Sequence, residues 1–201
     1  MTTQGRPGAD LADALAALHR GEVIAVATDT VYGLACDPRD AAAVDRIYTL
    51  KRRPADLELT LLAHDIGQLE GVVAWTPVAA RLAGTYWPGP LSLVLPVGES
   101  RLAVPRSGAT LSVRVPAHGL LLALLEQTGP LASTSANRHG QPPAVLAAAV
   151  RSQFGDQVSV IVGGGSPAGQ ASTIIDCSVT PPRVLREGPI DRRSLSEFVQ
   201  G

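Results

Sequence analysis

The chain has 201 residues, of which 45% are hydrophobic and 17% are charged, and its formal net charge at pH 7 is −1. This composition is typical of a folded protein with a sizeable core, and it excludes a disordered chain or one with a strong overall basic field for nucleic acid. The sequence has no apolar run near the length of a membrane-spanning helix, no signal-peptide core and only two cysteines, so we expect a cytoplasmic protein without a disulfide scaffold.

Hydrophobic periodicity predicts helices and strands that are unevenly interleaved along the chain. Leucines three and four residues apart predict a first helix, and Asp40 is expected to cap a second helix that ends near Lys51. The predicted helices are residues 10–20, 40–51, 76–86, 117–127, 143–154 and 194–199. The predicted strands are residues 22–27, 59–63, 91–95, 111–115, 130–133, 158–162, 172–176 and 183–185.

Several of these strands, in the middle and at the end of the chain, follow one another with no helix between them. This order favours a mixed sheet over a regular doubly wound parallel sheet. The sequence contains no internal repeat and no long linker. We therefore predict a single α/β domain over residues 1–201, with a core of about residues 10–190 and a twisted mixed sheet flanked by helices.

The first candidate for chemistry is the segment TDTVYGL, residues 28–34, directly after a predicted strand. It places two threonine hydroxyls and the carboxylate of Asp29 beside Gly33, which allows a ligand to approach the backbone closely. Open α/β sheets bind ligands at such strand ends. The alternative is a polar turn in which Asp29 bonds the backbone.

The second candidate is a cluster of three cations, Lys51, Arg52 and Arg53, at the end of a predicted helix. A lysine point charge and an arginine fork together suit a phosphate chain, although cations also favour a helix C-terminus without any ligand. Lys51 is the only lysine among 17 basic residues, and Asn137 is the only asparagine. Such exceptions point to positions that require these side chains, and chance placement is the alternative.

Two further candidates lie on predicted strands. Alternation places Thr110, Ser112 and Arg114 on one face of a strand, where they are costly to bury unless they are paired or bind something. A solvated edge strand is the alternative. Residues 133–137, STSAN, follow an apolar strand, and their hydroxyls and backbone N–H groups are suited to an anion. The alternative there is a loop or a helix cap.

The order of these motifs is more specific than any one of them. The chain carries, in order, TDTVYGL, KRRP, WPGPLSLVL, SVRVPAH, PLASTSAN, STIID and VLREGPI. Over about residues 22–190 this order resembles the YrdC/YciO family, and most of all its short members of the TsaC type. The resemblance implies a YrdC/RibB-like fold with a concave basic cavity. It also implies a single domain, without the additional C-terminal domain of longer members.

The resemblance further implies an L-threonylcarbamoyladenylate synthase, a nucleotidyltransferase that acts in the threonylcarbamoyladenosine modification of tRNA. Its substrates would be ATP, L-threonine and bicarbonate, with Mg²⁺ delivered by ATP and no metal site of its own. The resemblance also implies partner proteins of tRNA modification and contact with tRNA or other RNA. It implies no association with a membrane.

Carried over position by position, the family's site falls on residues of this chain. The threonine side comprises Thr30, Arg114, Ser133 and Ser172. The ATP side comprises Lys51, Arg53, Thr110, Ser135, Asn137 and Arg186. Of these, Lys51, Arg53 and Arg114 are expected to be catalytic.

Leu57 and Glu58 depart from the family pattern, which commonly has a polar residue and then proline at these positions. A leucine cannot donate a hydrogen bond, and a glutamate near phosphates would repel them. Two other functions therefore stay open at this point: a YciO-like paralogue that binds a nucleotide or RNA without synthase activity, and a carbamoyl-transfer enzyme with another acceptor.

Overall fold

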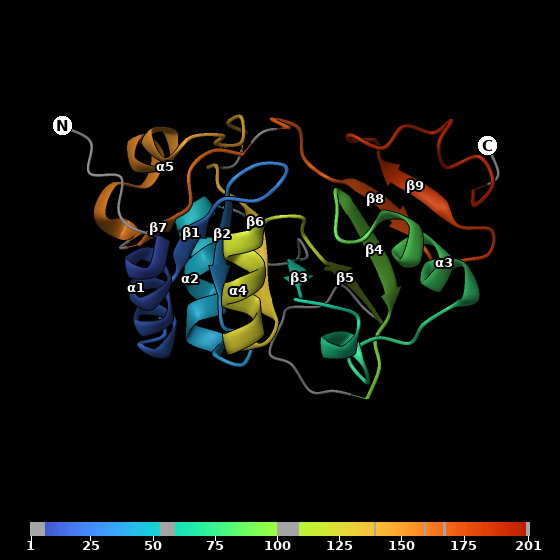
Figure 1. Cartoon of the computed structure of the whole chain (residues 1–201), viewed down its shortest axis with the longest axis horizontal. Helices are drawn as coiled ribbons and strands as arrows, with labels where there is room; N and C mark the ends of the chain where they lie inside the picture. Colours follow the sequence, from blue (N-terminus) through green and yellow to red (C-terminus); the bar gives the residue numbers. More distant parts are fainter. Residues whose placement is uncertain are drawn as a thin grey trace.

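The computed structural model describes residues 7–52, 59–99, 109–138, 140–158, 160–166 and 168–199. Its described strands form one nine-stranded sheet in the order β7-β1-β2-β6-β3-β5-β4-β8-β9 (Figure 1). The pairs β1–β7, β3–β5 and β4–β8 are parallel, and the other five pairs are antiparallel. The predicted mixed sheet is therefore confirmed. Its strands are β1 Ile24–Val26, β2 Gly33–Cys36, β3 Thr60–Leu62, β4 Leu91–Pro96, β5 Thr110–Arg114, β6 Leu131–Ser135, β7 Ile161–Val162, β8 Thr173–Asp176 and β9 Arg183–Arg186.

The helices begin where the sequence offers a capping side chain. Asp40 caps α2, because its Oδ1 accepts hydrogen bonds from the backbone N–H groups of Ala42 and Ala43, and Thr76 caps α3 in the same way. None of the described helices has the length and hydrophobicity needed to span a bilayer. The α-helices are α1 Pro7–His19, α2 Ala41–Lys51, α3 Pro77–Tyr86, α4 Gly119–Thr128 and α5 Ala147–Phe154, and the short 3-10 helices are η1 Gly67–Leu69 and η2 Gly155–Gln157.

The two faces of the sheet differ in what covers them. On one face, Ile24, Leu62 and Leu131 pack with apolar residues of α1 and α4. On the other face, Leu61 and Leu93 belong to a larger cluster that includes α2 and α3. Since side chains alternate along a strand, Thr60 and Ser133 share the first face with Leu62 and Leu131. Polar side chains therefore gather on the face that α1 and α4 cover only in part.

Four sequence predictions need correction. Residues 194–199 form successive turns rather than a helix, because their backbone bonds are mostly of the three-residue type. Strand β2 was not predicted, since all four of its residues are buried and show no alternation. Helix α5 begins four residues later than expected, after Leu146 has bridged to Gly165, and β7 is shorter than the predicted strand.

Candidate functional site

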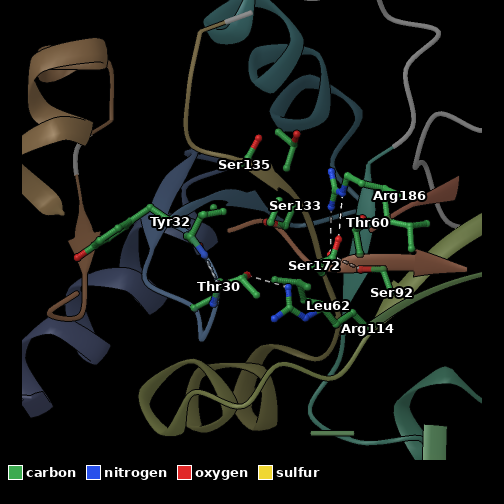
Figure 2. Close-up of a pocket in the computed structure, with 16 residues that line it drawn as sticks. Thr30, Tyr32, Thr60, Leu62, Ser92, Arg114, Ser133, Ser135, Ser172 and Arg186 are labelled. Atoms are coloured by element: carbon green, nitrogen blue, oxygen red, sulfur yellow. Dashed lines mark hydrogen bonds between the residues drawn. The ribbon is translucent and has the colours of Figure 1, made fainter. Parts of the chain in front are cut away.

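A cavity of about 180 Å³ opens on the face of the sheet that α1 and α4 share. Strands β2 to β6, β8 and β9, and the turn before β2, all contribute to its walls (Figure 2). Two arginines line it, Arg114 and Arg186, and no carboxylate is among its described lining residues. Most of its polar lining is hydroxyl: Thr30, Thr60, Ser92, Ser133, Ser135 and Ser172. The chemistry of this lining suits an anionic ligand rich in oxygen.

The turn between β1 and β2 presents Thr30 to the cavity. The Oγ1 of Thr28 accepts hydrogen bonds from the N–H groups of Thr30 and Val31, at 3.0 and 3.2 Å, and donates to the carbonyl of Val31. The hydroxyl of Tyr32 donates to the carbonyls of Gly163 and Gly164, which ties the turn to a glycine-rich segment. The turn is thus built by Thr28, and among the described residues no backbone N–H donates to the Asp29 carboxylate, contrary to the alternative of a turn that Asp29 bonds.

Asp29 instead pairs with Arg114. The Nη2 of Arg114 lies 2.6 Å from the Oδ1 of Asp29, Nη1 donates to the Oγ1 of Thr30 at 3.0 Å, and Nε donates to the carbonyl of Gly89 at 2.9 Å. The side chain of Arg114 is only 6% exposed. Burial lowers the pKa of Arg114 and the nearby Asp29 opposes this change, which keeps the guanidinium charged.

The strand of Arg114 is not a solvated edge strand. β5 lies between β3 and β4, and Ser112 and Arg114 are both buried, so the alternative given for this strand is wrong. Ser112 Oγ lies 3.0 Å from Thr60 Oγ1, which joins two adjacent strands on the cavity side. Thr110 is not among the residues that line the cavity.

Arg186 contributes the second cation. Its Nε donates to the carbonyl of Ser172 at 3.0 Å, and its Nη2 donates to the Ser172 hydroxyl, which also contacts Ser92. Among the described residues no carboxylate pairs with Arg186. Desolvation and the charge of Arg114 both lower the pKa of Arg186, and both arginines line the same cavity. An anion in this cavity would be attracted by both charges.

Ser133 has the hydroxyl with the fewest hydrogen-bond partners among the described residues that line the cavity. Its side chain is buried, and the described part of the chain gives its Oγ no hydrogen-bond partner. A Cβ on Gly33 would lie 2.7 Å from this oxygen, so glycine keeps the space beside it open. Trp75 Nε1, and not this oxygen, is the polar atom that is fully buried without a partner among the described residues, so Ser133 Oγ reaches the open space of the cavity, where a ligand oxygen can take the place of water.

Lys51 and Asn137 are brought together beside the turn that follows β6. The ammonium of Lys51 is buried and donates to the carbonyls of Ser135 and Asn137 and to the Asn137 side-chain oxygen. That same oxygen accepts from the Ser135 hydroxyl, and the Asn137 amide donates to the carbonyls of Arg138 and Gln141. Neither Lys51 nor Asn137 lines the cavity. Both hold the turn after β6 in place.

Arg53, Leu57 and Glu58 lie outside the described residues, so the structure describes Lys51 and Arg52 of the cation cluster but not Arg53 or the departure from the family pattern. The structure does bring Thr30, Arg114, Ser133, Ser135, Ser172 and Arg186 to one cavity. Ser172, predicted for the threonine side, bonds directly to Arg186, predicted for the ATP side, so residues of the two predicted sides are in contact here.

Several residues in or beside the cavity were not among the predicted site residues, notably Asp29, Thr60 and Ser92. Asp29 stands in the first motif, where its carboxylate was noted but assigned no partner. Thr60 and Ser92 are isolated hydroxyl residues in otherwise apolar strands, and that alternation is the signal that could have marked them.

The two cysteines are not candidates for nucleophilic catalysis. Cys36 and Cys177 are buried and neither lines the cavity. Burial raises the pKa of both thiols to about 12, so neither is a thiolate near neutral pH.

The chain is similar in sequence and fold to several known proteins. The family model Sua5/YciO/YrdC, described as "Telomere recombination", matches residues 16–188. A threonylcarbamoyl-AMP synthase of Chromohalobacter salexigens is 43% identical over 170 residues, which cover 83% of this chain and 91% of that protein. The crystal structure of Pyrococcus abyssi Sua5 complexed with L-threonine superimposes with a TM-score of 0.88 and 36% identity, over 96% of this chain and 58% of that chain. Escherichia coli YciO superimposes with a TM-score of 0.85 and 28% identity, over 98% and 95% of the two chains.

Proposed function

Because the chain belongs to the Sua5/YciO/YrdC family, we infer that it is an ATP-dependent nucleotidyltransferase that makes L-threonylcarbamoyl-adenylate. Relatives from bacteria and archaea carry the name threonylcarbamoyl-AMP synthase. One observation in the structure carries the inference: the buried Arg114 and the exposed Arg186, which no described carboxylate neutralises, line one cavity rich in hydroxyls. Such a cavity suits the carboxylate of an amino acid and the phosphates of a nucleotide.

The reaction that we propose joins three substrates in two steps. The amine of L-threonine attacks the carbon of bicarbonate, which gives a carbamate and releases water. A carbamate oxygen then attacks the α-phosphorus of ATP, the bond to the β-phosphate breaks, and pyrophosphate leaves. No bond to the protein forms in either step. The protein therefore acts by holding the reactants together and by balancing the negative charge of the phosphates.

The contacts of each residue indicate which part of the reaction it would serve. Arg114 would hold the threonine carboxylate, since its fork is already aligned by Thr30 and Asp29. Arg186, which no described carboxylate neutralises, would face the phosphates together with Arg53. Ser133 lies on the same strand and face as Ser135. Its hydroxyl, which no described residue hydrogen-bonds, would hold an oxygen of the carbamate. Lys51 and Asn137 would act through the turn that they brace.

The described lining of the cavity does not fit a metal site built by the protein. It includes no carboxylate, and no group of His, Cys, Asp and Glu within the described ranges could hold a metal ion. Mg²⁺ prefers a few carboxylates, water and substrate phosphates as ligands. We therefore propose that Mg²⁺ enters bound to ATP.

The same proposal has four further parts. Bicarbonate is the carbon source, the adenylate passes to partner proteins of tRNA modification, the protein contacts tRNA, and it is located in the cytoplasm. The YciO-like alternative is not favoured, because the chain is more similar to the named synthases than to YciO.

Pyrophosphate release tests this function directly. The purified protein is incubated with ATP, Mg²⁺, L-threonine and bicarbonate, and each component is omitted in turn. We expect pyrophosphate only in the complete mixture. Release of pyrophosphate or phosphate without threonine or bicarbonate would contradict the synthase and point to a nucleotide-binding or other transfer function.

A further inference from the structure

We propose that Asp29 is a positioning residue, which orients Arg114 so that two of its N–H groups face the substrate carboxylate. This inference rests on the proposed function, because it takes the ligand of Arg114 to be L-threonine. Asp29 does not line the cavity, whereas Arg114 does. Its influence on a ligand must therefore pass through Arg114.

The guanidinium of Arg114 is held at three points. Asp29, Thr30 and Gly89 accept one hydrogen bond each, from three different nitrogens. A guanidinium has five N–H groups, so two remain, one on each terminal nitrogen. Such N–H groups can donate to the oxygens of a carboxylate. The contact with Asp29 is the shortest of the three and the only charged one.

The charge of Asp29 also permits two arginines in one cavity. The side chains of Arg114 and Asp29 are 6% and 13% exposed, so each charge has lost most of its water. Without the carboxylate, Arg114 would be an uncompensated buried cation. Arg186, whose pKa the charge of Arg114 lowers, would then face a positive group without its compensating carboxylate. We expect the guanidinium to turn away from its present plane in response.

The variant Asp29→Asn removes the charge and keeps an oxygen that can accept from Arg114. We expect the KM for L-threonine to rise about tenfold, which corresponds to about 1.4 kcal/mol, while the KM for ATP changes less than about twofold. Asp37→Asn is the matched control, because Asp37 pairs with Arg39 at 2.8 Å on the surface. Thermal unfolding of both variants separates loss of fold from loss of orientation.

A second readout does not depend on activity. In ¹⁵N spectra of arginine side chains, the held guanidinium of Arg114 should show slow rotation of its terminal nitrogens, and Asp29→Asn should speed that rotation. If Asp29→Asn does not fold, Asp29→Glu keeps the charge but shifts it by one methylene. We expect Asp29→Glu to raise the KM for threonine selectively as well.

Two results would overturn the inference: an unchanged KM for threonine in Asp29→Asn, or equal increases in the KM for threonine and for ATP together with a lower melting temperature. The first would show that Arg114 needs no positioning by Asp29, and the second would show a structural role alone. Both require an active wild-type protein. An inactive wild type would instead refute the proposed function, so the two failures are distinguishable.

Discussion

Arg114→Lys is expected to reduce kcat/KM for L-threonine by about a hundredfold or more, with little loss of fold. Lysine keeps the positive charge beside Asp29, so the buried carboxylate is not left without a counterion. It cannot, however, bond Gly89, Thr30 and Asp29 at once and still present two N–H groups to a carboxylate. The measurement is steady-state pyrophosphate release with threonine varied at saturating ATP.

Arg186→Lys is the comparison for this variant, since Arg186 would face the phosphates rather than the amino acid. It should raise the KM for ATP more than the KM for threonine. A threonine dependence unchanged in Arg114→Lys would remove Arg114 from the threonine site. A large fall in melting temperature would show instead that Arg114 serves mainly as a structural ion pair.

Lys51→Met is expected to lower the free energy of unfolding by about 2–4 kcal/mol and to raise the KM for ATP. Methionine fills similar space but leaves the carbonyls of Ser135 and Asn137 and the Asn137 side-chain oxygen without this donor in a buried region. The turn after β6 should then move, and Ser135 with it. Denaturant unfolding and the ATP dependence of pyrophosphate release measure the two effects.

Arg52→Met is the matched control, because Arg52 is the next residue, carries the same charge and is exposed. We expect it to change both quantities little. Should Lys51→Met raise the KM for ATP without any loss of stability, Lys51 would contact the nucleotide directly, as the sequence interpretation held. The change in the free energy of unfolding therefore distinguishes a structural role of Lys51 in the turn after β6 from direct contact with the nucleotide.

The parts of the fold that sequence predicted well are those with local signals. Asp40 was expected to cap a helix, and the structure confirms it. A helix was predicted to begin at Thr76, and the structure shows Thr76 as the capping residue directly before α3. The turn series after Asp191 was mistaken for a helix because Leu195 and Phe198 are buried at helical spacing, which successive turns also provide. Spacing alone does not report the hydrogen-bond pattern.

The site was predicted as a set of residues but not as a set of contacts. The pairing of Asp29 with Arg114 joins positions 85 residues apart, and it depends on the strand order of the sheet, which no local pattern encodes. The rarity of Lys51 did single out an important position. It could not show that the ammonium points at backbone carbonyls, because that follows from how α2 packs beside the end of β6.

The central claim is that one cavity joins threonine, a bicarbonate carbon and AMP. The most direct test is mass spectrometry of the nucleotides formed from ATP, L-threonine and ¹³C-bicarbonate. The account predicts an adenylate that contains threonine and a single ¹³C atom, formed by the wild-type protein and nearly absent with Arg114→Lys. An adenylate of threonine without ¹³C, or AMP with no adenylate in rapidly quenched samples, would contradict it.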